Sequence, residues 1–363
     1  MSGNVGSVNG GGYGIMQQLI ADNAAIRAHS NALIAQASSG FVSQSYAGLG
    51  DGASVALNLN PQLHDLQSWQ TNIGQATGVM QVTQTAMTQI QSIASTFWAD
   101  TMNLNGLNAS EVDSVAANAR SALQQVADLL DTKDGNSYVF AGQDTANAPV
   151  PSPDNILSSG FYTQINAAVS ALSTNGAAAT IASTLATASS NASGTSPFST
   201  YMSQPASSID PLVVQVGEGQ TVRYTMLASA NSAVQSSGTS TTGSYMRDLM
   251  RSLATLGSLT SSQVNDPNFA ALVQDTRTSL NGAITAMATD VGVMGDRQTG
   301  LTKTQTQLSE TATALTGQIS NVQDVDMAKT LSELAQINTQ LQASYQLLAT
   351  ENGLSLAKFL PAS

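Results

Sequence analysis

Apolar residues repeat every seven positions along a stretch in the first third of the chain. The two rows of this repeat are Leu66, Ile73, Met80, Met87 and Ala94, and Trp69, Ala76, Thr83, Ile90 and Phe97. Rows that lie three and four residues apart fall on one side of an α-helix and make a seam that packs against a partner helix. The pattern therefore predicts one long helix over residues 63–99.

A similar seam lies near the other end of the chain. One of its rows is Leu301, Leu308, Leu315 and Val322, and the second contains Ala312 and Ile319. Because helices with matching seams can bury them against each other, we predict that the two stretches form a helical bundle. The residues predicted to form this bundle seam are Leu66, Trp69, Ile73, Met80, Met87, Ile90, Phe97, Leu301, Leu308, Leu315, Ile319 and Val322.

The spacing of apolar residues also predicts a helix with an apolar stripe at each end of the chain. One helix covers residues 13–39 and ends at Ser38-Ser39-Gly40, and the other covers residues 325–350. Asn338 takes an inward position in the last helix, where a polar residue often sets the register of pairing. We predict that the two stripes form an assembly interface made of Ile15, Leu19, Ile26, Leu33, Leu331, Leu334, Asn338, Leu341, Tyr345 and Leu348.

Shorter helices are predicted between these stretches. Ser110 is the predicted N-cap of one, a second starts near Tyr245, and a third has Pro267 in its first turn. Gly292 and Gly295 stand between the third helix and the second seam, so we expect an interruption there.

The segment from residue 149 to 242 has a different character, because Pro, Ser, Thr, Ala and Gly dominate it. Such a composition predicts long loops and a domain boundary. Alternating residues predict one hairpin, formed by 212–216 and 221–227. Residues 165–195 are compatible with a weak helix, and residues 138–142 with either a short strand or a packed connection.

These patterns predict a mainly α fold: an elongated rod of long antiparallel helices, with a coiled-coil terminal region, a helical bundle and a small β-containing middle domain. The expected segments are a flexible start (1–12), a first helix and the connection after it (13–62), the N-terminal half of the bundle (63–148), a middle segment with the hairpin (149–242), the C-terminal half of the bundle (243–324) and a last helix (325–363).

The chain is poor in charge. Only 9% of its residues are charged, against about 25% in ordinary soluble domains. Uncharged polar side chains are less costly to bury than charged ones, which favours a subunit whose surface becomes interface over a soluble protein of low complexity. The net charge of −12, with eleven scattered basic residues, argues against nucleic acid as a partner.

The absence of cysteine and of apolar runs limits the compartment and the chemistry. Without Cys the chain has no disulfide and no thiol nucleophile, which fits a protein exported unfolded. Residues 1–14 contain no basic residue and no apolar core, so we expect no secretory signal peptide and a flexible start. No run of about 18 apolar residues occurs, so we expect no membrane insertion.

We find no pattern that carries catalysis. His29 and His64 each lack a second ligand at metal spacing, so no metal site is expected. The glycine-rich loop 48–52 lacks the lysine of a phosphate-binding loop, and residues 131–136 lack the ligand pattern of a calcium loop and read as a turn. No Gly-x-Ser-x-Gly motif is present. We expect a non-enzyme without cofactor or catalytic residues.

Two motifs carry a resemblance to a known family. The helix that opens with Asp324-Val325-Asp326-Met327-Ala328 and continues through Leu341-Gln342-Ala343-Ser344-Tyr345 to Gly353-Leu354-Ser355-Leu356 resembles the C-terminal core helix of the bacterial flagellin superfamily. The stretch Asp134-Gly135-Asn136-Ser137-Tyr138-Val139-Phe140-Ala141-Gly142 is similar to one that follows the N-terminal helices of hook–filament junction proteins (hook-associated protein 3).

Weaker matches point the same way. Ser38-Ser39-Gly40 fits the family pattern after the first helix, although Ala37 stands near the place of the usual Arg, and the family's paired Asp is reduced to Asp51-Gly52-Ala53. The hairpin at residues 216–222 resembles part of the junction proteins' middle domain.

The resemblance implies a role and partners. In flagellin-like subunits the terminal helices pair in the inner layer of a tube, the middle faces outward, and export uses the flagellar type III apparatus, usually with a dedicated chaperone. The resemblance therefore implies that residues 1–12 are an export segment, that 13–62 and 325–363 hold the N-terminal core helix with its spoke and the C-terminal core helix, and that 149–242 are a variable outer domain. The implied partners are copies of this chain, hook-associated protein 1, flagellin and the export chaperone, in an extracellular flagellum.

Other functions remain open at this stage. A filament-forming flagellin would carry the same seams as a junction subunit. A chemoreceptor rod would require a membrane anchor and exposed Glu/Gln pairs, and neither is seen. A carbohydrate-binding adhesin or hydrolase would place its site in residues 149–242.

Overall fold

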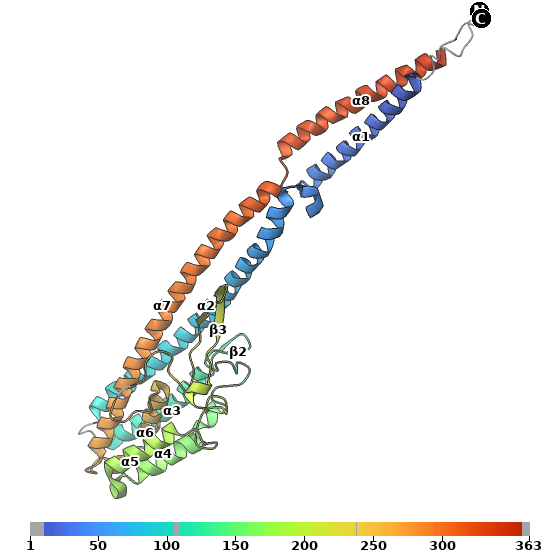
Figure 1. Cartoon of the computed structure of the whole chain (residues 1–363). Coiled ribbons are helices and arrows are strands. Elements are labelled where there is room, and N and C mark those ends of the chain that lie inside the picture. The colour runs from blue at the N-terminus through green and yellow to red at the C-terminus, as the bar shows by residue number, and fades with distance from the viewer. Residues whose placement is uncertain (1–10, 105–108, 237, 358–363) are drawn as a thin grey trace, which may run out of the picture. The chain divides into compact units, whose positions relative to one another are not determined.

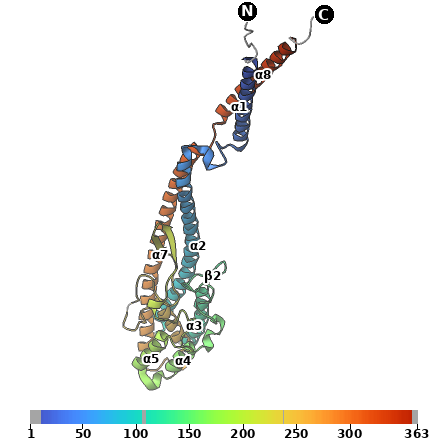
Figure 2. The same cartoon turned by 45° about the vertical axis from the view of Figure 1, so that its right-hand side comes forward.

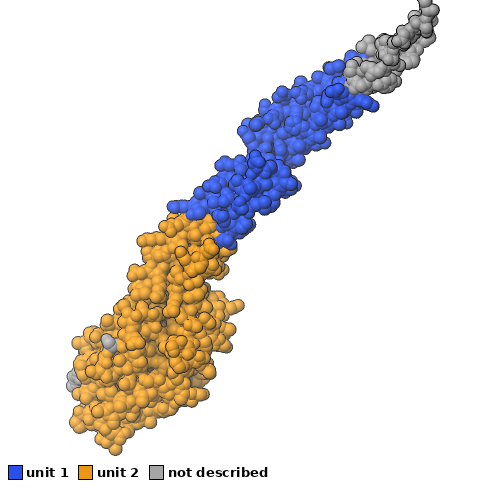
Figure 3. All heavy atoms as spheres, in the orientation of Figure 1, with its two compact units in different colours: residues 1–65, 310–363 blue, residues 66–309 orange. Residues whose placement is uncertain are grey.

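The computed structural model describes residues 11–104, 109–236 and 238–357, with the side chains of 11–16 and 351–357 outside the description. The chain divides into two compact units, coloured in Figure 3: unit 1 consists of residues 1–65 and 310–363, and unit 2 of residues 66–309. The fold is mainly α with long antiparallel helices, as the sequence predicts, and the described residues contain two small antiparallel sheets. Most of the expected segment 1–12 lies outside the described residues.

Unit 1 is built on two helices from opposite ends of the chain. α1 (Gly11–Ser39) and α8 (Met327–Ala357) lie side by side in Figures 1 and 2. They are antiparallel, because Asn23 contacts Ser344 while Phe41, 18 residues further along, pairs with Asp324. The short η1 (Tyr46–Leu49) and the adjoining ends of α2 (Gly52–Asn103) and α7 (Phe269–Gln323) complete the unit.

α2 and α7 are both longer than the sequence indicated. α2 begins at Gly52 rather than at residue 63 and runs through Pro61. The expected interruption at Gly292 and Gly295 is wrong, because α7 is one helix of 55 residues. Glycine inside a helix costs about 1 kcal/mol relative to alanine. The row of apolar residues continues at intervals of seven across this point, and its buried members offset that cost: Leu280, Met287, Met294 and Leu301.

In unit 2 the seams of α2 and α7 face each other and lead into one core. Gln305 donates a hydrogen bond from Nε2 to the backbone oxygen of Gln70 at 3.4 Å, and Gly295 lies opposite Gln84, so the two helices are antiparallel here. α3 (Ala109–Leu130) packs against α6 (Tyr245–Gly257), in which every residue is buried. Four further helical elements pack against α3 or α6: η2 (Pro153–Ser158), α4 (Gly160–Ser170), α5 (Leu172–Ser189) and η4 (Ser261–Gln263).

The middle segment is more ordered than expected. Residues 149–242 contain α4 and α5, which pack on each other and on α6, rather than long loops with one weak helix. α5 bends at Gly176, whose φ of 78° is a conformation that favours glycine. Composition alone concealed α5 because its buried face includes small residues such as Thr180, Thr184 and Ala188, which lack a strong apolar period. The buried row Phe161, Ile165 and Val169 of α4 has helical spacing, and it was a signal that composition alone did not reveal.

The two hairpins fix the connections around this core. β3 (Val213–Gly217) and β4 (Gln220–Arg223) form the predicted hairpin, although β4 is shorter than expected. β1 (Lys133–Asp134) and β2 (Ser137–Tyr138) turn at Gly135, with a φ of 58°. The residues after β2 form a packed connection, in which Phe140 accepts a hydrogen bond from the backbone N–H of Ala228 at 3.0 Å. η3 (Ala206–Ser208) precedes β3.

Candidate functional site

The exposed apolar side chains of the described residues are concentrated in unit 1. Nine of the eleven large hydrophobic side chains that are exposed belong to this smaller unit, and only Met102 and Val213 belong to unit 2. The nine are Ile20, Ile34, Phe41, Tyr46, Leu57, Met327, Leu331, Tyr345 and Leu347. Such a concentration of exposed apolar side chains in one unit favours an interaction with another macromolecule there.

Unit 1 also has little core of its own. The large hydrophobic cluster of the described residues is formed by unit 2. In unit 1 the buried hydrophobic residues are Leu33, Ala56, Ile319 and Ile337. Two helices can cover only one face of each other, so part of the apolar surface of α1 and α8 is left uncovered by the other described residues.

The seam between α1 and α8 is partly polar. Asn23, Ser30 and Thr330 are buried there. Asn23 donates a hydrogen bond from Nδ2 to Ser344 Oγ at 2.9 Å and accepts one at Oδ1 from Arg27 Nε at 3.0 Å. The guanidinium of Arg27 lies 5.2 Å from the centre of the Tyr345 ring. A buried amide with one specific partner disfavours other registers of the pair.

The structure places the predicted interface residues in two groups. Leu19, Ile26, Leu33, Leu334, Leu341 and Leu348 are buried or half-buried, whereas Leu331, Asn338 and Tyr345 are exposed. The side chain of Ile15 lies outside the described residues. The inward position predicted for Asn338 is wrong. The buried residue is Ile337, which continues a row seven residues from Thr330 and Ser344.

The exposed residues form a second set of rows at the same spacing. Ile20, Arg27 and Ile34 follow one another every seven residues on α1, and Leu331, Asn338 and Tyr345 do so on α8. We call these two rows the outer rows. Leu331 is 52% exposed and Ile34 is 50% exposed, so each outer row presents apolar side chains to solvent on either side of a central polar residue, Arg27 or Asn338.

The predicted bundle seam lies largely inside the units. Leu66, Ile73, Met80, Met87, Ile90, Phe97 and Leu301 are buried in unit 2, where Trp69 and Leu308 are half-buried. In unit 1, Ile319 is buried and Leu315 and Val322 are half-buried. These residues therefore serve packing within the chain.

A short backbone clasp ties the connection after α1 to the connection before α8. The backbone N–H of Val42 donates to Gln323 O at 2.8 Å, and the N–H of Val325 donates to Gly40 O at 2.9 Å. Gly40 has a φ of 76°, which favours glycine and ends α1 at the Ser38-Ser39-Gly40 motif. Because these two hydrogen bonds involve Gly40 and Val42, they fix the position of Phe41 between them. The clasp could not be predicted from the residue pattern, because hydrogen bonds between backbone groups leave no side-chain pattern.

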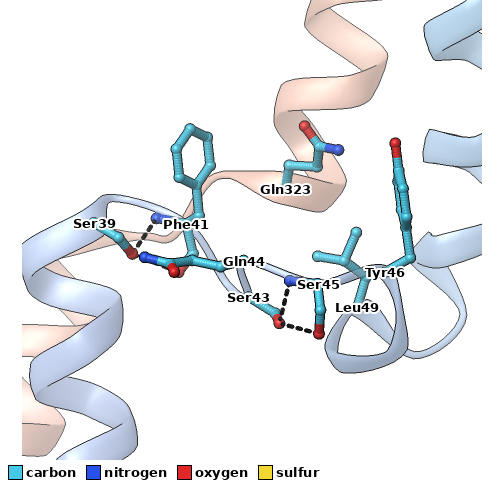
Figure 4. Close-up of a pocket in the computed structure, with 8 residues that line it drawn as sticks. All are labelled: Ser39, Phe41, Ser43, Gln44, Ser45, Tyr46, Leu49 and Gln323. Carbon is cyan, nitrogen blue, oxygen red and sulfur yellow. Dashed lines mark hydrogen bonds between the residues drawn. The ribbon is translucent and has the colours of Figure 1, made fainter.

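Beside the clasp lies an open depression of about 620 Å³. Figure 4 shows the rings of Phe41 and Tyr46 on either side of it, with Leu49 and Gln323 between them. Its other lining residues are serines and a glutamine, and none is charged. An uncharged, partly apolar depression suits a protein side chain or segment better than a charged small molecule.

The described residues give no support to a metal or membrane site. No group of three or more His, Cys, Asp or Glu side chains lies close enough to hold a metal ion within the described ranges. The described helices include none that is long and apolar enough to cross a membrane. His29 and His64 are exposed and lie in different helices of unit 1.

The carboxyl of Asp131 in unit 2 has a clearly perturbed pKa. Burial raises the pKa of the Asp131 carboxyl from 3.8 to about 6, although the backbone N–H of Val150, which donates to Oδ1 at 2.9 Å, acts in the opposite direction. Nearby Asp128 adds to the increase and Lys133 opposes it. Because Asp131 joins the end of α3 to the chain before η2, its ionisation bears on the stability of unit 2.

Comparison with known families settles which proteins this chain is related to. A family model described as the bacterial flagellin N-terminal helical region matches residues 13–145, and one described as the bacterial flagellin C-terminal helical region matches residues 278–360. Together they cover more than half of the chain. The chain belongs to the bacterial flagellin superfamily. The proteins of this family are structural subunits and not enzymes. The chain is accordingly a structural subunit of the flagellum.

The fold has a counterpart among solved structures. A structure described as a candidate flagellar hook-associated protein from Vibrio parahaemolyticus is similar with a TM-score of 0.50 at 12% identity. The match covers 74% of this chain and 96% of that one. No curated protein matches the sequence. The motifs at 38–40, 134–142 and 324–356 all lie within the residues that the flagellin-family models match, whereas the hairpin at 216–222 lies outside them.

Proposed function

We propose that this protein is a hook–filament junction subunit that polymerises through α1 and α8. The observation that carries the proposal is the concentration of exposed apolar side chains in unit 1. The flagellin family assembles into an axial structure, so the expected occupant of this surface is another subunit of that structure.

The outer rows offer a physical route to assembly. Seam-type rows on both helices let a third and a fourth helix pack against the pair, as in higher-order helical assemblies. Complete burial of a large aliphatic or aromatic side chain contributes about 1.5–3 kcal/mol. An isolated helix pair is marginal in water. Contacts between neighbouring copies therefore stabilise α1 and α8 as well as the polymer.

The low charge of these helices supports the same proposal. α1 and α8 display mainly uncharged polar residues between their apolar rows, and Lys329–Glu333 is an ion pair at 3.9 Å on the exposed surface of α8. Uncharged polar groups lose less free energy on leaving water than charged groups do. A surface of this composition can become interface at modest cost.

The junction role is favoured over the filament role by sequence resemblance. The stretches 134–142 and 353–356 are similar to junction proteins, and the solved counterpart is described as hook-associated. The second candidate is the filament flagellin itself, because the family models that match are those of flagellin. In either role we propose export without a cleaved signal peptide, a flagellar export chaperone, and contacts with hook-associated protein 1 and flagellin.

Electron microscopy of purified flagella separates the two roles. A gold-binding tag inserted in the turn at Glu218-Gly219, which is exposed between β3 and β4, leaves the terminal helices unchanged. A junction subunit gives label only at the boundary of hook and filament. Label along the whole shaft identifies the filament flagellin instead and contradicts the junction role.

A further inference from the structure

Unit 2 contains a polar pocket that the assembly role does not use. It has a volume of about 260 Å³. Its lining residues come from four segments, 189–191, 204–206, 229–235 and 242–244, and from the start of α6. The one charged side chain that lines it is Arg247, which is 8% exposed. Eight of the other eleven lining residues carry a hydroxyl or amide side chain, among them Asn191, Gln204 and Gln235, and the remaining three are Ala206, Ala230 and Gly243.

The guanidinium of Arg247 is held rigidly by neutral oxygens. Nε donates to Ser229 O at 3.2 Å, and Nη1 donates to Ala188 O at 3.0 Å and Ser190 O at 3.3 Å. Nη2 donates to Asn191 Oδ1 at 2.7 Å. The guanidinium also stacks on Phe198, with 5.1 Å to the ring centre. Its orientation is therefore fixed before any ligand arrives.

The positive charge of Arg247 has no carboxylate beside it. The ion pairs within the described residues are Arg251–Asp275 and Lys329–Glu333, and neither involves Arg247. Arg251, one turn further along α6, is equally buried but has Asp275 at 3.3 Å. A buried cation without a counter-charge is costly, although the carbonyl groups at the end of α5 reduce that cost.

One donor of this fixed guanidinium remains for a ligand. A guanidinium has five N–H groups, and the contacts above use four of them. The remaining N–H is on Nη2, whose other N–H donates to Asn191 Oδ1. The side-chain amides of Gln204 and Gln235 line the same pocket and make no hydrogen bond to another described residue. These groups are donors suited to oxygen atoms that carry negative charge.

We propose that this pocket binds an oxyanion group, a carboxylate or a phosphate, with Arg247 as its charged donor. The volume is below the range of about 300–1,000 Å³ that holds drug-sized ligands. The ligand is therefore a small anion or the charged end of a larger molecule. This inference is independent of the junction role, because every residue involved lies in unit 2.

The test is thermal unfolding of the full monomeric chain, followed by tryptophan fluorescence. Both tryptophans, Trp69 and Trp98, lie in unit 2, so the signal reports on the unit that holds the pocket. Inorganic phosphate and gluconate are titrated separately at constant ionic strength against chloride, with glucose as the neutral probe. Binding gives a saturable rise of a few degrees in the melting temperature. A rise with phosphate, with gluconate or with both identifies which oxyanion the pocket accepts.

The variant Asn191→Asp supplies a built-in counter-charge. It places a carboxylate where Asn191 Oδ1 now accepts from Arg247, so it is expected to melt higher in chloride and to lose the response to anions. Asn118→Asp, an exposed change on α3, is the matched control and keeps the response. General stabilisation by phosphate is not saturable and affects all three proteins equally. No saturable rise in the wild type, an equal rise with glucose, or a full response in Asn191→Asp overturns the proposal.

Discussion

The amide of Asn23 and the hydroxyl of Ser344, 321 positions apart in the chain, meet in a hydrogen bond of 2.9 Å. This contact joins the first helix to the last and lies in a seam that is otherwise made of small polar and aliphatic residues. Because Asn23 also accepts from Arg27, its two side-chain groups are both used. The ends of the chain are therefore paired in one defined register.

Substitution of Asn23 tests the role of this contact. Asn23→Ala leaves Ser344 and Arg27 without their partner and is expected to weaken the α1–α8 pair by about 1 kcal/mol. Amide hydrogen exchange of the full monomeric chain measures this as faster exchange in both helices. Asn31→Ala, at an exposed position of α1, is the matched control and should leave exchange unchanged. Equal effects of the two changes would show that the contact does not stabilise the pair.

The outer row of α8 separates assembly from folding. Leu331→Glu puts a charge on a side chain that is 52% exposed, so the monomer should keep its helix content by circular dichroism. In the polymer the same charge would be buried without a partner, and incorporation into flagella should fail. Ser332→Glu, the exposed neighbour, carries the same charge and should incorporate normally. Normal incorporation of Leu331→Glu contradicts the proposed interface.

The connection between α1 and α2 tolerates no larger residue at Gly48. A Cβ atom there would lie 2.6 Å from Ser43 Cβ, a contact that rotation of the Ser43 side chain cannot relieve. Gly48→Ala should therefore distort the wall of the depression and lower assembly. Gly292→Ala, where a Cβ meets nothing within 4 Å inside α7, should raise stability by up to about 1 kcal/mol. Chemical denaturation and assembly assays of both variants measure the difference.

The stability of unit 2 should depend on pH through Asp131. Its folded-state pKa of about 6 lies above the ordinary value of 3.8, so the folded chain holds more protons than the unfolded chain between these values. The free energy of unfolding therefore falls as the pH rises from about 4 to about 6. Asp131→Asn keeps an acceptor for Val150 but cannot ionise, so it should flatten this dependence.

The matched control for that experiment is Asp134→Asn in β1, three residues further along the chain, where the side chain is exposed. Urea denaturation followed by tryptophan fluorescence gives the free energy of unfolding of each protein at several pH values. A slope that is unchanged in Asp131→Asn would show that other carboxyls cause the dependence.

The sequence predicts the long helices well because their seams are regular. Rows such as Ile73, Met80 and Met87 recur at a fixed interval over many turns, and burial on one face imposes that interval. The same logic failed locally at Gly292, since a glycine is only a weak helix breaker when apolar residues on both sides stay in register. The existence of the helices was therefore easier to predict than their ends.

The site was harder to predict because register and backbone contacts are not visible in composition. Asn338 has the spacing of a seam residue, but Ile337 next to it occupies the seam, since a shift by one residue moves a side chain by about 100° around a helix. The buried polar contact is instead at Asn23, which single-sequence periodicity does not distinguish from a solvent-facing residue. The hydrogen bonds that hold Arg247 come from loops that meet only in the folded chain.

The central claim is that exposed side chains of unit 1 become buried when subunits assemble. Hydroxyl-radical labelling of the free monomer and of purified flagella measures it directly, with Met327 and Tyr345 as reporters in unit 1 and Met102 as the exposed reporter in unit 2. We predict that labelling of Met327 and Tyr345 falls sharply on assembly relative to Met102. Unchanged labelling of both unit 1 residues in assembled flagella would contradict the account.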